Sequence, residues 1–295
     1  MKLMVFGFGY TARYVAERLR PGSAEIAATV RTPGKAEMLV GTGIRASVFS
    51  PEHRDPAIAQ QIAGSDAVLL SIPPDAAGDP VLAAFAGAMA AAPKLRWIGY
   101  LSTIGVYGDH AGGWVDEATP VAPVEARSQA RARVEQEWLA FGAAHGVAVL
   151  IFRLPGIYGP GRNQLAQLAA GDARRIVKPG QVFNRIHVAD IAAVIEASLR
   201  RPRAGAIYNV GDDEPAPLQD VIGFAAGLCG VEPPPEIPFE SAELSPMARG
   251  FYGESKRVRS ALIRSELGVE LRYPSYREGL TALRAAGEGP ATAPA

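Results

Sequence analysis

Short apolar runs alternate along the first half of the chain with segments in which apolar residues recur every three or four positions. Residues 3–6 form the first run, and in the segment that follows Ala12, Val15, Ala16 and Leu19 share one helical face. Further apolar runs lie at 26–30, 45–49, 67–72 and 97–101, with amphipathic or alanine-rich segments between them. This pattern predicts strands alternating with helices. We therefore expect an α/β fold with a Rossmann-type, doubly wound parallel sheet.

The first predicted strand leads into a glycine-rich turn. Gly7, Gly9 and Ala12 have the spacing G-x-G-x-x-A between a strand and a helix. In that context the first glycine permits the turn, the second lets a pyrophosphate approach the backbone, and the small third residue allows close packing. The helix start also directs N–H groups at the turn. The turn predicts a dinucleotide site, against the alternative of a merely tight turn, with these expected binding residues: Gly7, Phe8, Gly9, Tyr10 and Thr11.

The residue at the end of the second predicted strand bears on the choice of dinucleotide. Arg31 lies 22 positions after Gly9, and Thr32 follows it. An acidic residue there suits the ribose of NAD, whereas an arginine suits the 2′-phosphate of NADP. We expect NADP(H), with NAD as the alternative; a solvated strand-end arginine is the other interpretation of Arg31. Ser71 completes the expected cofactor residues because two prolines end its strand at the ligand-binding edge of the sheet.

Composition narrows the classes of partner. The 295 residues carry 30 Lys and Arg against 30 Asp and Glu, which does not favour nucleic acid or an anionic membrane. The single Cys229 and four scattered histidines predict neither a disulfide nor a metal site. No export signal or apolar run of about 18 residues is present, so we expect a cytoplasmic protein with a small-molecule substrate.

Further motifs follow the glycine turn: Ser102-Thr103, Val106-Tyr107-Gly108, Val115-Asp116-Glu117 with Pro120, the segment 153–162, the segment 186–192 and the segment 207–211. Through these motifs the chain resembles the extended short-chain dehydrogenase/reductases of the NAD-dependent epimerase/dehydratase family, and in particular the atypical subgroup that lacks the active-site tyrosine. The resemblance implies an NAD(P)-binding domain over 1–160 and a region over 161–284 that completes the sheet and forms a small C-terminal substrate lobe. The Pro- and Gly-rich residues 285–295 predict a disordered tail.

The resemblance fails where the family carries its Tyr-x-x-x-Lys catalytic pair. Thr103 matches the family's Ser or Thr, but alignment through Glu135 puts Arg127 at the tyrosine position and Arg131 at the lysine position. Arginine stays protonated, so Arg127 cannot accept a proton from an alcohol. The alternative for these arginines is a solvated helix face with charge pairs to Glu135. Gly156 also stands where family members that handle nucleotide sugars often carry asparagine.

The function implied is that of an NAD(P)-binding, epimerase/dehydratase-like oxidoreductase acting on a sugar-like or anionic small molecule. Thr103, Arg127 and Arg131 are the expected catalytic residues, and a non-catalytic NADP(H) sensor is the alternative. Tyr107, Tyr158 and His110 are weighed as substitutes for the missing tyrosine. Lys256 and Arg257 are candidates for an anionic substrate, or else a solvated basic turn. Family members often dimerise through the helix carrying Arg127, which implies a homodimer.

Overall fold

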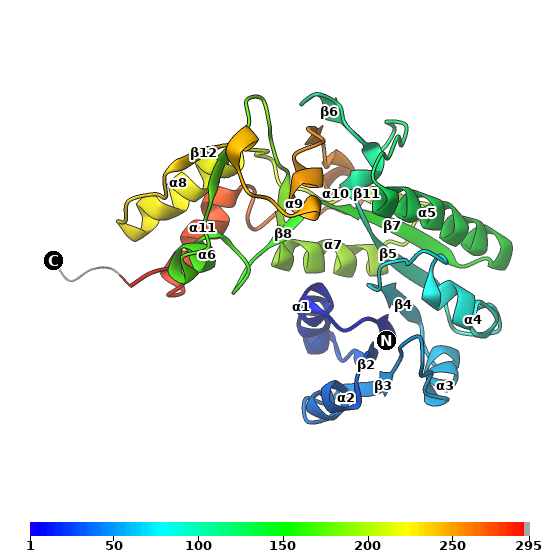
Figure 1. Ribbon diagram of the computed structural model, residues 1–295. Helices are drawn as coiled ribbons and strands as arrows, with labels where there is room; N and C mark the ends of the chain where they lie inside the picture. The colour runs from blue at the N-terminus through cyan, green and yellow to red at the C-terminus, as the bar shows by residue number, and fades with distance from the viewer. Residues whose placement is uncertain (292–295) are drawn as a thin grey trace.

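The computed structural model describes residues 1–291 and is built around a seven-stranded sheet in which every pairing is parallel (Figure 1). The strand order is β11-β7-β5-β4-β1-β2-β3. The bounds are β1 Lys2–Phe6, β2 Glu25–Val30, β3 Arg45–Val48, β4 Ala67–Leu70, β5 Trp97–Thr103, β7 Ala148–Leu154 and β11 Ile207–Asn209. The predicted α/β class and the parallel, Rossmann-type sheet are confirmed.

Helices cover both faces of this sheet, because successive side chains of its strands point to opposite sides. Leu3 and Val5 of β1 pack into one core with α1 (Tyr10–Leu19) and α7 (Val188–Arg200). Met4 and Phe6 pack into the other core with α3 (Ala57–Ala63), α4 (Pro80–Ala90) and α5 (Ala126–His145). The sheet is therefore doubly wound, and both cores are formed largely by the strands predicted from apolar runs. The remaining helix before β3 is α2 (Pro33–Val40).

A smaller lobe stands beside the sheet and is built mainly from the second half of the chain (Figure 1). Its helices pack around a core of their own that includes Leu165, Ala225 and Leu280. The lobe contains α6 (Gln164–Ala170), α8 (Leu218–Cys229), α9 (Pro246–Phe251), α11 (Tyr276–Ala285) and the parallel strand pairs β8 (Gly156–Tyr158) with β10 (Arg185–His187) and β9 (Arg175–Val177) with β12 (Glu236–Pro238). The other elements are β6 (Trp114–Val115) paired with β13 (Arg257–Val258), α10 (Ala261–Ser265), and the 3-10 helices η1 (Arg20–Gly22), η2 (Ile104–Tyr107) and η3 (Phe239–Ser241).

The chain after α11 is tied to the lobe as far as it is described. The carboxylate of Glu288 accepts hydrogen bonds from Gly161 N at 3.0 Å and from Asn163 Nδ2 at 2.6 Å. These contacts fall within the stretch 285–295 for which the sequence predicts disorder, and residues 292–295 of that prediction lie outside the described residues.

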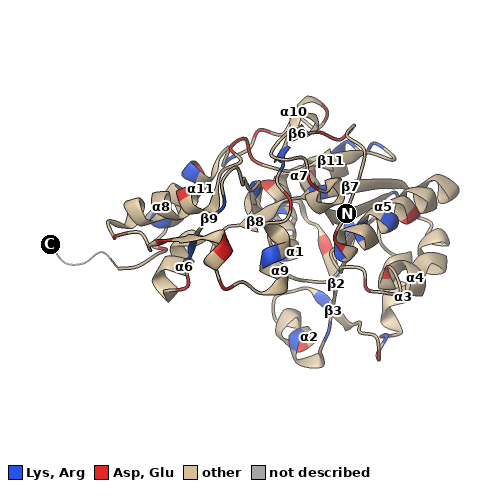
Figure 2. Ribbon diagram, turned by 45° about the horizontal axis from the view of Figure 1, so that its top comes forward, with Lys and Arg blue, Asp and Glu red and all other residues tan. Residues whose placement is uncertain are grey.

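Charged residues of both signs are spread over the fold (Figure 2), and the single cysteine is buried. Lys and Arg alternate with Asp and Glu over both parts of the fold (Figure 2). Cys229 is buried at the end of α8. Among residues 1–291, no helix has both the length and the apolar character that crossing a membrane requires.

Candidate dinucleotide site and substrate cleft

The glycine turn after β1 has a backbone that only glycine adopts without strain. Gly7 has a φ of 86°, and a Cβ at this position would lie 2.8 Å from Ile72 Cγ1. Its N–H donates to Thr29 Oγ1 at 2.9 Å, and Phe8 N donates to the carbonyl of Thr29 at the same distance. Because a left-handed backbone and a close neighbour coincide here, the turn is held tightly between the ends of β2 and β4.

Beyond this turn, the first residues of α1 leave room for a ligand. Gly9 is the N-cap residue, no side chain caps the helix start, and a Cβ at Gly9 would have no atom within 4 Å. The N–H groups of the first helical turn have no intrahelical partner and carry a partial positive charge. Thr11 is buried, while the hydroxyl of Tyr10 donates to the carbonyl of Pro160 at 3.1 Å. Open space in front of unpaired amides fits the pyrophosphate of a dinucleotide.

The other expected cofactor residues follow the neighbouring strands. Arg31 follows β2 and is exposed, Thr32 is the N-cap residue of α2, and Ser71 follows β4 with its N–H bonded to Phe6 O at 2.9 Å. Since β1 lies between β2 and β4, these residues share one edge of the sheet with Gly7. The strand order reverses at this point, which is where doubly wound sheets bind their ligands.

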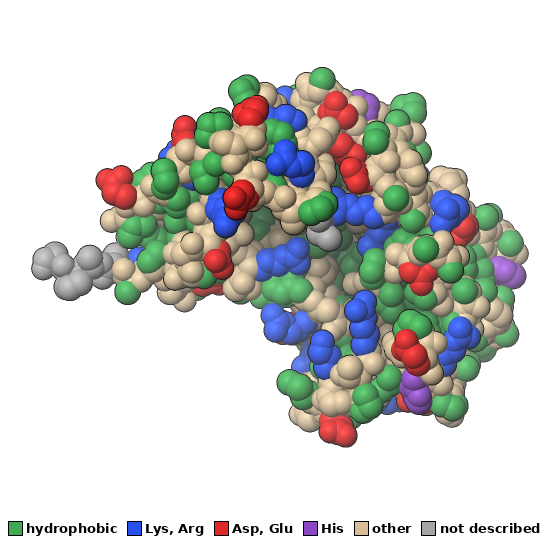
Figure 3. Space-filling view, in the orientation of Figure 1, with side chains coloured by type: hydrophobic (Ala, Val, Ile, Leu, Met, Phe, Trp, Pro, Cys, Tyr) green, Lys and Arg blue, Asp and Glu red, His purple; other side chains and the backbone are tan. Residues whose placement is uncertain are grey.

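A cleft of about 1060 Å³ opens between the sheet edge and the smaller lobe, and Figure 3 shows Lys and Arg side chains gathered around a hollow there. It begins at Pro73, Pro74 and Thr103 and continues under α9 into the lobe. The charged residues that line it are Glu125, Arg127, Arg131, Arg162, Asp172, Arg174, Arg185, Glu254 and Lys256. Cations outnumber carboxylates in this set, which favours an anionic ligand.

All three expected catalytic residues line this cleft. Thr103 ends β5, and its hydroxyl oxygen accepts a hydrogen bond from Gly105 N at 3.1 Å. The guanidinium of Arg127 lies 4.2 Å from the centre of the Phe251 ring, so α9 closes over it. Arg131 donates through Nη1 to the carbonyl of Leu101 at 2.5 Å and to the hydroxyl of Tyr100 at 3.3 Å, and within residues 1–291 its Nε and Nη2 groups make no hydrogen bond.

The alternative of a solvated helix face laced with charge pairs fails for Glu135. This residue is 0% exposed, and its carboxylate binds Arg153 of β7 at 2.7 Å. It also accepts a hydrogen bond from Ser102 Oγ at 2.5 Å. Glu135 therefore anchors α5 to β5 and β7 from beneath the cleft, and it makes no ion pair with Arg131.

The substitutes weighed for the missing tyrosine have different environments. Tyr107 is buried and donates to Asn209 Oδ1 at 2.8 Å, while His110 Nε2 lies 3.1 Å from the carbonyl of Tyr107. Neither lines the cleft. Tyr158 does line it, but its hydroxyl donates to Ser275 O at 3.2 Å and burial raises its pKa. None of the three is placed as a ready acid or base.

Of the two basic candidates near the C-terminus, only Lys256 lines the cleft. Lys256 is 5% exposed, lines the cleft and pairs with Glu254 at 2.7 Å. Arg257 is not a lining residue and donates instead to the carbonyl of Gly112. Within residues 1–291, no group of three or more His, Cys, Asp or Glu side chains is arranged to hold a metal ion.

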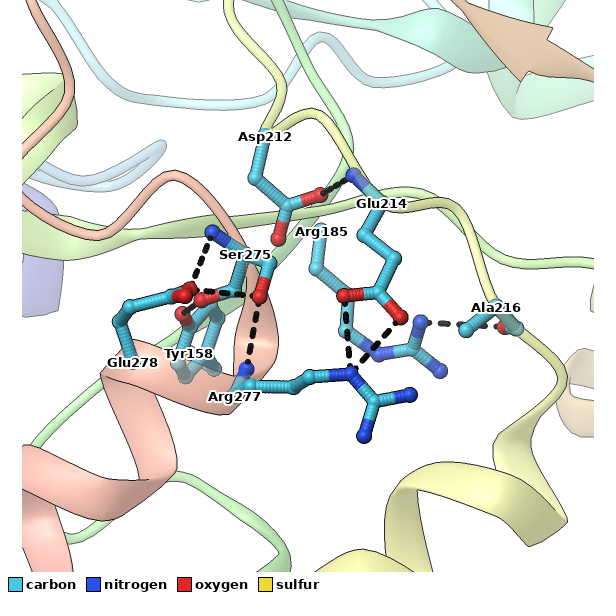
Figure 4. Close-up of polar contacts among 8 residues, drawn as sticks. All are labelled: Tyr158, Arg185, Asp212, Glu214, Ala216, Ser275, Arg277 and Glu278. Atoms are coloured by element: carbon cyan, nitrogen blue, oxygen red, sulfur yellow. Dashed lines mark hydrogen bonds and ion pairs between the residues drawn. The ribbon is translucent and has the colours of Figure 1, made fainter.

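Sequence reasoning missed a buried polar group on the lobe side of the cleft (Figure 4). Arg185 of β10 and Asp212, which follows β11, are both nearly inaccessible to solvent. Tyr252 and Glu254 line the same cleft from the segment after α9. The only hint in the sequence was the polar dipeptide Asn184-Arg185 directly before the motif 186–192. A three-residue strand is too short to show the periodicity that would mark Arg185 as buried.

The architecture defines a Rossmann-type protein with an appended smaller lobe. The model of the NAD dependent epimerase/dehydratase family matches residues 83–211. Over these residues the chain is similar to this family, which is the resemblance that the motifs indicated.

Three known proteins show how similar this chain is to others in sequence and in fold. "Protein YeeZ" of Escherichia coli (strain K12) is 34% identical over 187 residues, which cover 63% of this chain but only 61% of YeeZ. A solved structure described as a functionally unknown conserved protein from Silicibacter pomeroyi DSS is 49% identical, with a TM-score of 0.88 over 97% of this chain and 99% of that one. UDP-glucuronic acid 4-epimerase from Bacillus cereus, solved in complex with NAD, superposes with a TM-score of 0.78 at 17% identity, over 97% of this chain and 96% of that one.

Proposed function

We propose that this chain binds NADP(H) and acts as an epimerase/dehydratase-like oxidoreductase on a sugar-like or anionic small molecule. The observation that carries the proposal is the open space at Gly9, in front of the uncapped start of α1 and beside a cation-lined cleft. The Bacillus cereus epimerase, whose fold this chain shares, was solved with NAD. A nicotinamide dinucleotide would supply the hydride acceptor or donor at such a site.

Preference for NADP(H) rests on Arg31 and Thr32. Arg31 is exposed at the carboxyl end of β2, where the adenosine ribose of a dinucleotide lies in this architecture. Its guanidinium matches the 2′-phosphate of NADP in charge and geometry. The position after β2 therefore carries an arginine and not the acidic residue that would favour NAD.

The cleft residues then divide the work on the substrate. Thr103 orients a substrate oxygen through its hydroxyl, and Arg131 holds a ribose or phosphate oxygen with its Nε and Nη2 groups. Arg127 polarises a carbonyl or anionic group at the mouth of the cleft. Because guanidinium does not release its proton at ordinary pH, neither arginine exchanges protons with the substrate.

Calorimetric titration with NADPH and NADH tests the cofactor assignment on wild type, Arg31→Ala and Gly9→Ala. Loss of a charge-assisted bond to phosphate is worth about 1.5–3 kcal/mol, so Arg31→Ala should weaken NADPH at least tenfold and leave NADH unchanged. Gly9→Ala should fold with a loss of less than about 1 kcal/mol, because its Cβ meets open space, yet lose both dinucleotides. Equal binding of NADPH by all three proteins would refute the site.

A non-catalytic NADP(H) sensor is the second candidate, favoured by the replacement of the catalytic pair with Arg127 and Arg131. Dinucleotide oxidation or reduction with a panel of carbonyl and sugar substrates separates the two functions. Turnover that Thr103→Val abolishes supports the enzyme, whereas tight NADPH binding with no turnover on any substrate supports the sensor. The homodimer through α5 and the domain boundaries at 160 and 284 remain predictions for solution measurements.

A further inference from the structure

Arg185 is a buried cation with donors to spare. It is 5% exposed and lines the cleft from the short strand β10. Its Nη1 donates to the carbonyls of Phe183 at 2.9 Å and Ala216 at 3.1 Å. Within residues 1–291 its Nε and Nη2 groups make no hydrogen bond (Figure 4).

Neither Asp212 nor Glu214 forms an ion pair with Arg185 among the contacts of residues 1–291, although both carboxylates act on its pKa. Glu214 is paired with Arg277 at 3.0 Å. Asp212 forms no ion pair with Arg185 among the described contacts, and burial raises its pKa to about 8 although the charge of Arg185 acts in the opposite direction. One oxygen of Asp212 has no hydrogen-bond partner in the described part of the chain, although the residue is only 2% exposed.

A comparison within the same protein shows that this arrangement is unusual. Arg153 is also deeply buried, but its Nε and Nη2 groups both donate hydrogen bonds to the carboxylate of Glu135. An unpaired buried charge is costly, which is why such groups are normally paired. Arg185 has two carbonyl partners but no carboxylate in contact among residues 1–291, so its free donors can pair with an anion in the cleft.

A second unpartnered group borders the same end of the cleft. The hydroxyl of Tyr252 is buried and has no hydrogen-bond partner among residues 1–291, and the charge of Arg185 acts on its pKa against the effect of burial. Both residues line the cleft. A phenol and a guanidinium with free donors are complementary to an oxyanion, which offers acceptors and a negative charge.

We propose that Arg185 and Tyr252 form an oxyanion subsite that takes a carboxylate or phosphate group of the substrate. This inference rests on the proposed function, since it names the group by which the small molecule is held in the lobe. The subsite lies on the lobe side of the cleft, whereas Thr103 and Arg131 line the side next to the sheet edge. A substrate held at both sides would extend from the lobe to the sheet edge.

Calorimetric titration with inorganic phosphate and with malonate tests the subsite on wild type, Arg185→Met and Tyr252→Phe. We expect at least one probe to bind wild type, about tenfold weaker binding to Arg185→Met, and an intermediate loss in Tyr252→Phe. The stronger probe identifies the group. Arg203→Met is the control because Arg203 pairs with Glu266 at 2.8 Å and lies outside the lining of the cleft, and the binding of this variant should equal that of wild type.

Several outcomes would overturn the subsite. Equal binding by wild type, Arg185→Met and Tyr252→Phe would mean that the anion binds elsewhere, and the absence of any binding to wild type would mean that no such subsite exists. Binding lost in Gly9→Ala but kept in Arg185→Met places the anion at the glycine turn instead. If Arg185→Met does not fold, Arg185→Lys and Tyr252→Phe decide in its place. If only the subsite proposal is wrong, wild type and these variants still bind NADPH equally well. If the proposed function is wrong, none of them binds NADPH.

Discussion

The buried ion pair beneath the cleft makes a quantitative prediction about stability. Glu135 and Arg153 are 0% and 2% exposed, and the shortest of their contacts is 2.7 Å. Glu135→Leu leaves the guanidinium buried without its partner, which costs about 3–5 kcal/mol. Ser102 also loses an acceptor at 2.5 Å, which adds about 1–2 kcal/mol. We expect Glu135→Leu to lose about 4–7 kcal/mol of a total stability of about 5–15 kcal/mol.

Urea denaturation of four proteins measures this effect: wild type, Glu135→Leu, Arg153→Met and the double variant. Because two apolar groups can pack where the ion pair stood, the double variant should be more stable than Glu135→Leu by about 2 kcal/mol or more. Glu137→Leu is the matched control on the same helix. Its carboxylate pairs with Arg133 at 3.7 Å on the surface, so its loss should cost less than about 1 kcal/mol.

Two results would refute this reasoning. One is a double variant whose loss equals the sum of the two single losses, which would mean that the charges do not depend on each other. The other is a Glu135→Leu variant no less stable than Glu137→Leu, which would mean that Arg153 finds water or another partner when Glu135 is removed.

Two further substitutions test the turn and the lobe. Gly7→Ala should lose about 2–3 kcal/mol in the same urea assay, because alanine disfavours a φ of 86° and its Cβ would lie 2.8 Å from Ile72 Cγ1; an unchanged midpoint would contradict the turn geometry. Asp212 has a pKa raised by burial to about 8, so the native state binds more protons than the unfolded chain between about pH 4 and pH 8, and wild-type stability falls across that window. Asp212→Asn removes this fall, so its stability relative to wild type should rise from about pH 5 to about pH 8 by at most about 1.4 kcal/mol per pH unit. A relative stability that is the same at both pH values would show that Asp212 titrates normally.

The local sequence pattern determined the sheet, the glycine turn and the positions of the expected cofactor residues. Apolar runs at 26–30 and 97–101 became β2 and β5 with shifts of one or two residues, because a strand buried on both faces must be continuously apolar. Gly7 and Gly9 could be assigned because their roles depend on the backbone within a few residues. Thr103, Arg127 and Arg131 were placed near one cleft because strand ends and the following helix meet at one edge of a parallel sheet.

Only the tertiary structure decided how the charged groups are paired. Glu135 suggested a surface partner one turn away on its own helix, but it binds Arg153 on a neighbouring strand inside the protein. Arg185 and Asp212 come from different elements, and nothing in their local sequence distinguishes a buried unpaired cation from a solvated one. The physical reason is that burial and pairing of a charge depend on which distant segments pack around it, and this packing carries no short-range pattern in the sequence.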